Sequence, residues 1–215
     1  MKKSILCYGD SNTWGYIPGV GRRFPEDIRW TGILQNLLGS TYEVIENGLV
    51  GRTTVFDDPY GPCRNGLASL DYALLSSAPL DLVILALGTN DLKFTDAFGS
   101  RRGAGRLLHE ILSANERLET GAPIFPNGAK VLLLSPIRVH PDVLRINPET
   151  NFRGAPLKSE EFTVQFSALP RQFPNVWFLD SAIYAGPSSR DGVHMDPDSH
   201  QKLGHAIYEQ VKLIL

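Results

Sequence analysis

The sequence predicts an α/β fold in which helices cover both faces of a central parallel sheet. Short apolar runs alternate along the chain with longer stretches of helical spacing, which is typical of strand–helix–strand units. The strand runs are apolar throughout, as expected when both faces of a sheet are buried. The chain has 215 residues and no internal repeat, which favours a single domain over residues 1–215.

The first part of the chain supplies two expected strands and two expected helices. Residues 4–8 form an apolar run that ends at Gly9, and apolar residues then recur with helical spacing over 30–38. A second strand is expected at 42–45, followed by a helix at 67–77. Because a helix follows each strand, parallel pairing is favoured.

The middle of the chain contains the strongest strand signal. Residues 80–87 read LDLVILAL and stop at Gly88. A helix is expected over 106–118 and a strand over 130–134. Residues 136–156 then show no clear period, and loops of that length in compact domains usually have a function or contact a partner.

The last part of the chain completes the pattern. Residues 159–169 are compatible with a helix, and 176–179 form a short fifth strand. Residues 199–215 have the apolar spacing of a closing helix. The sequence therefore predicts a sheet of five strands.

Composition excludes several classes of protein. Hydrophobic residues make up 42% of the chain and the net charge is −2, so neither a disordered chain nor a nucleic-acid-binding protein is expected. No segment approaches the roughly 18 apolar residues of a membrane span, and the run at 4–8 is shorter than a signal-peptide core. The two cysteines, Cys7 and Cys63, make no disulfide framework. We therefore expect a cytoplasmic protein that binds no membrane.

Candidate site residues lie where predicted strands end, because ligands of parallel sheets bind beyond the carboxyl ends of the strands. Ser11 follows the first strand, where a hydroxyl suits a nucleophile and equally suits a helix N-cap. Gly51 lies in the second turn, where a glycine exposes backbone N–H groups to a ligand or serves only the turn. Asn90 follows Gly88 and presents an amide to the same edge, although Asn-Asp there is also common turn chemistry.

Asp191 and His194 form the remaining candidate pair near the end of the chain. A spacing of three places both side chains on one side of a turn, so that the carboxylate can orient the imidazole and stabilise it when it becomes charged. The alternative is a solvated aspartate and a half-buried histidine in a loop.

Together these segments resemble the blocks of the SGNH (GDSL) hydrolase superfamily. The chain has GDSNTWG at 9–15, then Gly51, then GTND at 88–91 and finally DGVH at 191–194, in the order of that family. The flanking text, such as ENGLVGRTT at 46–54, is similar to the bacterial arylesterase/acyltransferase branch. The likeness covers nearly the whole chain.

The resemblance implies a fold, a reaction and a set of roles. The fold is a three-layer α/β/α flavodoxin-like sandwich with a central parallel five-stranded sheet. Ser11 is the nucleophile of a triad with His194 and Asp191, and an oxyanion hole is formed by the backbone N–H groups of Ser11 and Gly51 and the side-chain amide of Asn90. No metal or other cofactor takes part.

Two features of the sequence depart from familiar patterns. Residue 12 is Asn where the family motif has Leu, which predicts an altered pocket wall and intact chemistry. The order Ser, Asp, His is that of the α/β-hydrolases, but their G-x-S-x-G elbow is absent around Ser11, which favours the flavodoxin-like SGNH sheet.

Further residues are placed near the site by adjacency alone. Asn12, Trp14, Lys93 and Val193 neighbour the candidate catalytic positions and are expected to border the substrate pocket, although Trp14 equally suits core packing. The histidines at 140 and 200 have no partners at metal-ligand spacing, so surface or capping roles are expected for them.

The predicted function is a serine esterase that cleaves carboxylic esters of small or aryl alcohols, with acyl transfer to alcohols as a further activity. The alternatives are an acetyl-sugar deacetylase, a thioesterase or lysophospholipase and, outside enzymes, a flavodoxin-like module that binds a ligand at the turn carrying Ser11. The expected partner is a small-molecule ester. A homo-oligomer is also expected, with 136–156 as interface or lid.

Overall fold

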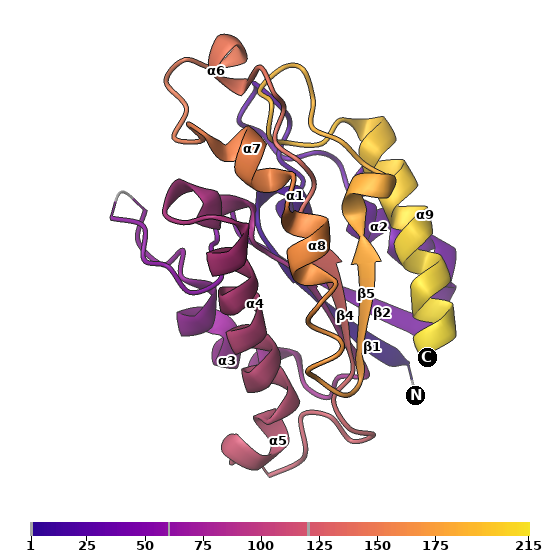
Figure 1. Cartoon of the computed structure of the whole chain (residues 1–215). Helices are drawn as coiled ribbons and strands as arrows, with labels where there is room; N and C mark the ends of the chain where they lie inside the picture. The colour runs from indigo at the N-terminus through magenta and orange to yellow at the C-terminus, as the bar shows by residue number, and fades with distance from the viewer. Residues whose placement is uncertain (1, 60, 120) are drawn as a thin grey trace.

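The computed structural model describes residues 2–59, 61–119 and 121–215 (Figure 1). Its central sheet has five strands in the order β2-β1-β3-β4-β5, and every neighbouring pair is parallel. The strands are β1 (Lys3–Gly9), β2 (Tyr42–Gly48), β3 (Leu82–Ala86), β4 (Val131–Ser135) and β5 (Val176–Asp180). This order is that of flavodoxin-like doubly wound sheets.

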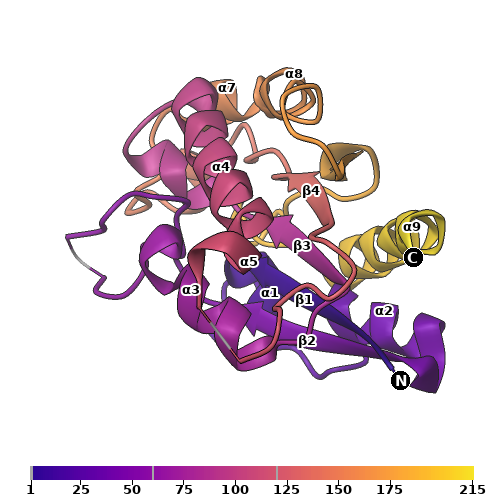
Figure 2. The same ribbon diagram turned by 90° about the horizontal axis from the view of Figure 1, so that it is seen from below.

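Helices cover both faces of the sheet, as Figures 1 and 2 show. Helices α2 and α9 pack on one face, and α3, α4 and α8 pack on the other. The helices are α1 (Ser11–Trp14), α2 (Trp30–Leu38), α3 (Gly66–Ser77), α4 (Ala97–Leu112), α5 (Ala114–Arg117), α6 (Val143–Ile146), α7 (Ala155–Ser159), α8 (Phe162–Phe166) and α9 (Pro197–Ile214), with short 3-10 helices η1 (Gly39–Thr41), η2 (Thr89–Lys93) and η3 (Ser181–Ile183). Among the described residues, no helix is long and apolar enough to span a bilayer.

The apolar strands are explained by two separate cores. Leu6 and Tyr8 of β1 belong to the core under α3 and α4, whereas Ile5 and Cys7 belong to the core under α2 and α9. Successive side chains of a strand point to opposite faces, so a strand covered on both sides must be apolar at every position. The predicted three-layer α/β fold is confirmed.

The five predicted strands are all confirmed, with ends within three residues of the expected ones. The largest difference is at β2, which continues to Gly48 rather than ending at 45. This strand lies at the edge of the sheet, and its last residues include the polar Glu46 and Asn47. An edge strand can carry polar side chains, so its apolar run is shorter than the strand itself.

Helix α4 begins at Ala97, so the predicted start at 106 is wrong. The missed half contains Gly99 and Gly103, and glycine lowers helix propensity by about 1 kcal/mol relative to alanine. Packing requires the glycine at 103, because a Cβ there would lie 1.9 Å from Oγ1 of Thr54. The side chain of Asp96 caps this early start by accepting from the N–H of Gly99.

The predicted helix over 159–169 is also wrong in its bounds. Two short helices stand in its place, with α7 beginning at Ala155 and α8 ending at Phe166. The irregular stretch 136–156 contains only α6 and the start of α7 as regular structure. It folds over the loop of residues 191–194, where the N–H of His140 donates to the carbonyl of Gly192 at 2.8 Å.

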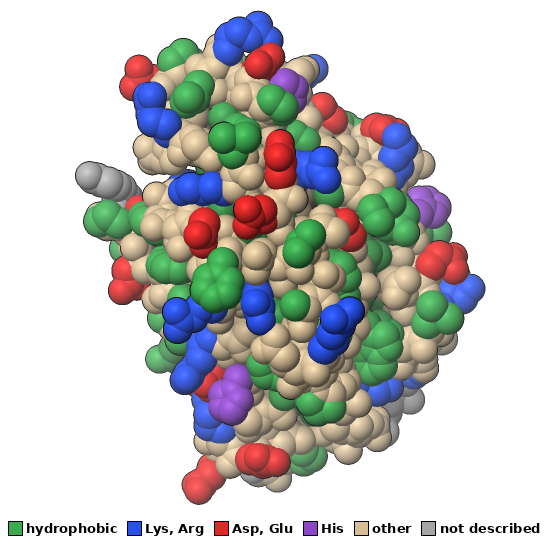
Figure 3. Space-filling model, in the orientation of Figure 1, with side chains coloured by type: hydrophobic (Ala, Val, Ile, Leu, Met, Phe, Trp, Pro, Cys, Tyr) green, Lys and Arg blue, Asp and Glu red, His purple; other side chains and the backbone are tan. Residues whose placement is uncertain are grey.

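The surface carries mixed charges. On the face in Figure 3, Lys and Arg side chains are interspersed with Asp and Glu. This distribution agrees with the net charge of −2 and offers no single-sign field over that face.

Candidate active site

Three turns meet at one edge of the sheet. Strand β1 ends at Gly9, which is in register with Gly48 of β2 and with Ala86 of β3. Because the three strands are parallel, the segments that follow them leave the sheet at the same edge. Ser11, Gly51 and the residues of η2 therefore lie in one region.

Ser11 is the first residue of α1, and Asp10 is the N-cap of that helix. The Asp10 carboxylate accepts from the N–H of Asn12 at 2.9 Å, so the alternative that Ser11 serves as the N-cap is wrong. The side chain of Ser11 is buried, with 5% of its surface exposed, and its hydroxyl is directed to another partner.

That partner is His194, as the expected triad of Ser11, His194 and Asp191 requires. Nε2 of His194 lies 2.9 Å from Oγ of Ser11, and Nδ1 lies 2.7 Å from Oδ2 of Asp191. A carboxylate only accepts hydrogen bonds, so Nδ1 carries the ring proton and Nε2 is free to accept from the serine. The structure thus brings together the three residues of the predicted triad.

Asp191 is held by its own turn. Its Oδ1 accepts from the backbone N–H groups of Val193 at 3.0 Å and His194 at 2.9 Å, and its Oδ2 accepts from Gly19 at 3.3 Å. Burial by itself raises the pKa of Asp191, but the hydrogen bond and charge of His194 and these backbone donors outweigh it and lower the pKa to about 2. The carboxylate is therefore charged at neutral pH, and the solvated-aspartate alternative is wrong.

The predicted oxyanion donors are also grouped. Among the hydrogen bonds of the described residues, none is donated by the backbone N–H of Ser11 or of Gly51. The side-chain amide of Asn90 donates one hydrogen to the carbonyl of Arg52 at 3.1 Å, which leaves its second hydrogen for a ligand. Arg52 in turn donates to the carbonyl of Gly9 at 2.9 Å, so the second and third turns are tied to the first.

The buried carboxyl of Asp91 holds in place the loop that follows Gly51. Asp91 accepts from the N–H of Thr54 at 2.8 Å and from its hydroxyl at 2.7 Å, which fixes the loop three residues beyond Gly51. Burial raises the pKa of Asp91 to about 7, although the hydrogen bonds from Thr54 and Ser100 act in the opposite direction. From the sequence, Asp91 was expected only as part of a turn, and this support was missed because Thr54 is far from it along the chain.

Asn12 joins α1 to the histidine loop. Its Oδ1 accepts from the N–H of Met195 at 3.0 Å, and its Nδ2 donates to the carbonyl of Val193 at 3.5 Å. The two bonds bracket His194 on both sides along the chain. An apolar side chain at position 12 could make neither bond.

A cleft of about 340 Å³ opens beside the imidazole of His194. Tyr16 stacks on His194 with ring centroids 4.1 Å apart, and Phe152 forms another wall. The lining residues are Tyr16, Gly19, Val20, Gly21, Asn147, Thr150, Phe152, Asp191, Val193 and His194. Of the residues expected to border the substrate pocket, Val193 lies on this wall.

The other predicted pocket residues have different surroundings. The Trp14 ring is half-buried, lies against Tyr16 at 6.3 Å and has the Arg23 guanidinium over it at 5.5 Å. Lys93 does not line the cleft, and its ammonium lies over the ring of Phe152, which does, at 4.9 Å from the ring centroid. Tyr16 and Phe152 were missed because nothing in their local sequence distinguishes them from packing residues.

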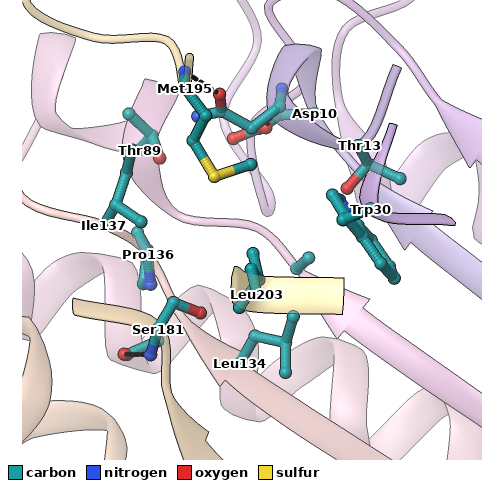
Figure 4. Close-up of a pocket in the computed structure, with 13 residues that line it drawn as sticks. Asp10, Thr13, Trp30, Thr89, Leu134, Pro136, Ile137, Ser181, Met195 and Leu203 are labelled. Carbon is teal, nitrogen blue, oxygen red and sulfur yellow. Dashed lines mark hydrogen bonds between the residues drawn. The ribbon is translucent and has the colours of Figure 1, made fainter. Parts of the chain in front are cut away.

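A second, smaller cavity lies behind α1 (Figure 4). It has a volume of about 30 Å³ and is bordered by Asp10 and Met195 together with Trp30 and Leu203. A buried water needs roughly 10–15 Å³, so the cavity can hold water beside the Asp10 carboxylate. Asn12 borders this cavity rather than the cleft.

The histidines considered for metal binding have capping contacts. His200 is fully buried, and its Nδ1 accepts from the N–H of Trp30 at the start of α2 at 3.3 Å. Nδ1 of His140 accepts from the N–H of Asp142 at 3.1 Å. In the part of the chain that the structure describes, no group of three or more His, Cys, Asp or Glu side chains could hold a metal ion.

Comparisons with known proteins agree with this geometry. The model of the GDSL-like lipase/acylhydrolase family matches residues 7–202. An aryl esterase from M. smegmatis is 38% identical with a TM-score of 0.88, covering 99% of this chain and 100% of its own. A carbohydrate acetylesterase from Sinorhizobium meliloti is 36% identical with a TM-score of 0.89, covering 100% of both chains. No curated protein matches the sequence.

Proposed function

This chain belongs to the GDSL-like lipase/acylhydrolase family and is a serine carboxylic-ester hydrolase, and we propose that Ser11 is the nucleophile with which it cleaves esters of small or aryl alcohols. The single observation that carries the proposal is the 2.9 Å contact between Oγ of Ser11 and Nε2 of His194. The predicted resemblance and enzyme class are confirmed, and the non-catalytic binding module is not supported.

In the first step, Oγ of Ser11 attacks the ester carbonyl while Nε2 of His194 takes the hydroxyl proton. The imidazole becomes a cation, which the ionised Asp191 stabilises across the 2.7 Å contact with Nδ1. The low pKa of Asp191 supports this role, because the carboxylate keeps its charge while the proton is on Nε2.

The carbonyl oxygen becomes an oxyanion as the new C–O bond forms. The N–H groups of Ser11 and Gly51, which donate to no acceptor among the described residues, and the second amide hydrogen of Asn90 are available to it. Gly51 has a φ of 83°, a conformation that favours glycine. Each donor of this kind contributes about 10²–10³ in rate.

In the second step, the tetrahedral intermediate collapses and breaks the ester C–O bond. The leaving alcohol takes the proton from Nε2 of His194, and the acyl group stays on Ser11. Water then attacks the acyl carbon, gives its proton to Nε2 and releases the acid as Oγ regains a proton. If an alcohol replaces water, the same steps produce a new ester, which is the acyl-transfer activity proposed from the resemblance.

The cleft beside His194 supports aryl or other small apolar alcohols as leaving groups. The rings of Tyr16 and Phe152 and the side chain of Val193 give it flat apolar walls. One observation favours an acetylated sugar as a second candidate: the same cleft is bordered by the polar side chains of Asn147 and Thr150, which can bond hydroxyl groups.

Hydrolysis of 4-nitrophenyl acetate by wild type and Ser11→Ala tests the proposal. We expect the Ser11→Ala rate to fall to background, and a phosphonate serine trap to add its mass to the peptide that contains Ser11. Ser167→Ala is the matched control, since this residue is exposed just after α8 and its hydroxyl donates to the local carbonyl of Val164. Equal rates for wild type and Ser11→Ala, or labelling elsewhere, would contradict the proposal.

The expected homo-oligomer stays a prediction. Light scattering of the protein in solution checks it, and a mass of one chain at all concentrations would count against it.

A further inference from the structure

The ammonium group of Lys93 has an unusual environment. Lys93 is the last residue of η2 and is half-buried. Among the described residues, no carboxylate or carbonyl is within hydrogen-bond or ion-pair distance of its Nζ, and its one direct contact is the face of the Phe152 ring at 4.9 Å. Burial lowers the pKa of Lys93, with the charge of Asp58 acting in the opposite direction. A desolvated cation without a direct anionic partner is costly.

Other cations near η2 do have partners. Lys158 donates to the carbonyl of Leu92 at 3.1 Å and to that of Thr95 at 2.9 Å. These two residues lie on either side of Lys93 in the sequence. The guanidinium of Arg64 donates to Asp58 at 2.8 Å. Among the described residues, Lys93 therefore lacks the direct polar contacts that Lys158 and Arg64 have.

Several contacts place Lys93 beside the catalytic centre. Its partner Phe152 forms a wall of the cleft that also contains His194. The charged groups that act on its pKa are Asp58, Arg64 and Asp10, of which Asp10 directly precedes the proposed nucleophile. The side chain of Arg64 covers Gly51, since a Cβ on that glycine would lie 2.7 Å from Nε of the arginine.

We propose that Lys93 binds a carboxylate carried by the substrate, so that the preferred esters are anionic. The Phe152 ring covers one side of the ammonium, and an anionic group in the cleft would supply the missing direct partner. Such a pair is shielded from water and is stronger than an exposed one. This inference rests on the proposed function and adds the substrate class to it. The carboxylate is carried by the acyl part or by the alcohol part of the ester.

Two matched substrate pairs test the inference and distinguish the two positions. For the acyl part, monoethyl succinate is compared with the neutral isostere ethyl 4-methylpentanoate. For the alcohol part, 4-acetoxybenzoate is compared with 4-carbamoylphenyl acetate. The measured quantity is the ratio of kcat/KM for the anionic ester to that for the neutral ester.

We expect wild type to prefer the anionic member of at least one pair. Lys93→Met lowers that ratio about 10-fold or more, whereas Lys93→Arg keeps it within about threefold, since a guanidinium can also bind a carboxylate. Lys202→Met is the control, because this exposed lysine on α9 already pairs with Asp198. The preference also weakens as salt is added.

A wild-type ratio of one or less for both pairs would overturn the inference, as would a ratio that Lys93→Met leaves unchanged. If wild type still hydrolyses neutral esters and Ser11→Ala does not, either of these results contradicts the role of Lys93 and leaves the proposed function of Ser11 intact. Calorimetry with Ser11→Ala protein gives a readout without catalysis: 4-acetoxybenzoate binds more tightly than 4-carbamoylphenyl acetate, and Lys93→Met removes the difference. Equal affinities of the two esters contradict the inference even if no ester is turned over.

Discussion

Tyr16 lies flat on the imidazole of His194, with ring centroids 4.1 Å apart and planes 25° apart. The ring covers one face of the group that we propose carries a proton between the two steps of the reaction. An aromatic face attracts a cation with about 0.5–2 kcal/mol, so the contact stabilises the imidazolium more than the neutral ring.

Replacing Tyr16 tests this stabilisation. We expect Tyr16→Leu to lower kcat/KM about 3- to 30-fold, while Tyr16→Phe retains most of the activity because it keeps the ring. Steady-state kinetics on one neutral ester measures both variants. Similar losses in Leu and Phe variants would show that the hydroxyl matters rather than the stacked face.

Asn90 is expected to act mainly on kcat. Asn90→Ala removes one oxyanion donor, and we expect kcat to fall about 10²–10³-fold with little change in KM. Asn115→Ala is a matched control, because that side chain also bonds backbone groups, those of Phe125, but on a different part of the fold. It should lose stability without this loss of kcat, and comparable kinetic losses in both variants would refute the role of Asn90.

Asn12 is expected to position His194 rather than to contact substrate. Asn12→Ala removes its bonds to Met195 and Val193, so the free energy of unfolding should fall by about 1 kcal/mol. We also expect kcat to fall while KM stays nearly constant, because the imidazole is less well held. Denaturant unfolding and kinetics measure the two effects, and a stability loss with unchanged kcat would limit Asn12 to a structural role.

Asp191 should matter to catalysis and to acid stability. Asp191→Asn is expected to lower kcat about 10³–10⁴-fold, because an amide cannot hold the correct tautomer or stabilise the cation. The pKa of Asp191 is lowered from 3.8 to about 2. The ionised carboxylate therefore stabilises the fold at pH values above 3.8, and this stabilisation is lost as the pH falls toward 2. Urea unfolding between pH 4 and 2 should show a smaller pH dependence in the variant than in wild type.

His200 should make the protein less stable in mild acid. Burial, with the charges of Arg29 and His194, lowers the pKa of His200 from 6.5 to about 4. The neutral imidazole therefore contributes stability that is complete above pH 6.5 and is lost as pH falls toward 4, by at most about 1.4 kcal/mol per pH unit.

His200→Gln isolates this contribution. The glutamine carbonyl can still accept from the N–H of Trp30 but does not titrate. We expect the free energy of unfolding of the variant to depend less on pH between 6.5 and 4 than that of wild type. Parallel pH dependences would contradict the assignment to His200.

The sequence by itself determined the sheet, the family and the identity of the triad candidates. Each strand was recognisable because both of its faces are buried, which forces a local apolar run such as 80–87. Ser11 and Asn90 were recognisable as candidates because each follows a strand, and the resemblance to the SGNH blocks supplied their expected roles and that of His194. These signals are local in the chain, so no knowledge of the loops was needed.

Only the tertiary structure decided how the loops complete the site. The start of α4 could not be recognised from the sequence, because Gly103 lowers the helical propensity there. Glycine is required at this position by its close contact with Thr54, which is far away in sequence. The stacking of Tyr16 on His194 and the cover of Phe152 over Lys93 join segments that are more than fifty residues apart. Such contacts depend on the path of irregular segments such as 136–156, which have no periodic pattern, and so they are fixed by packing rather than by local sequence.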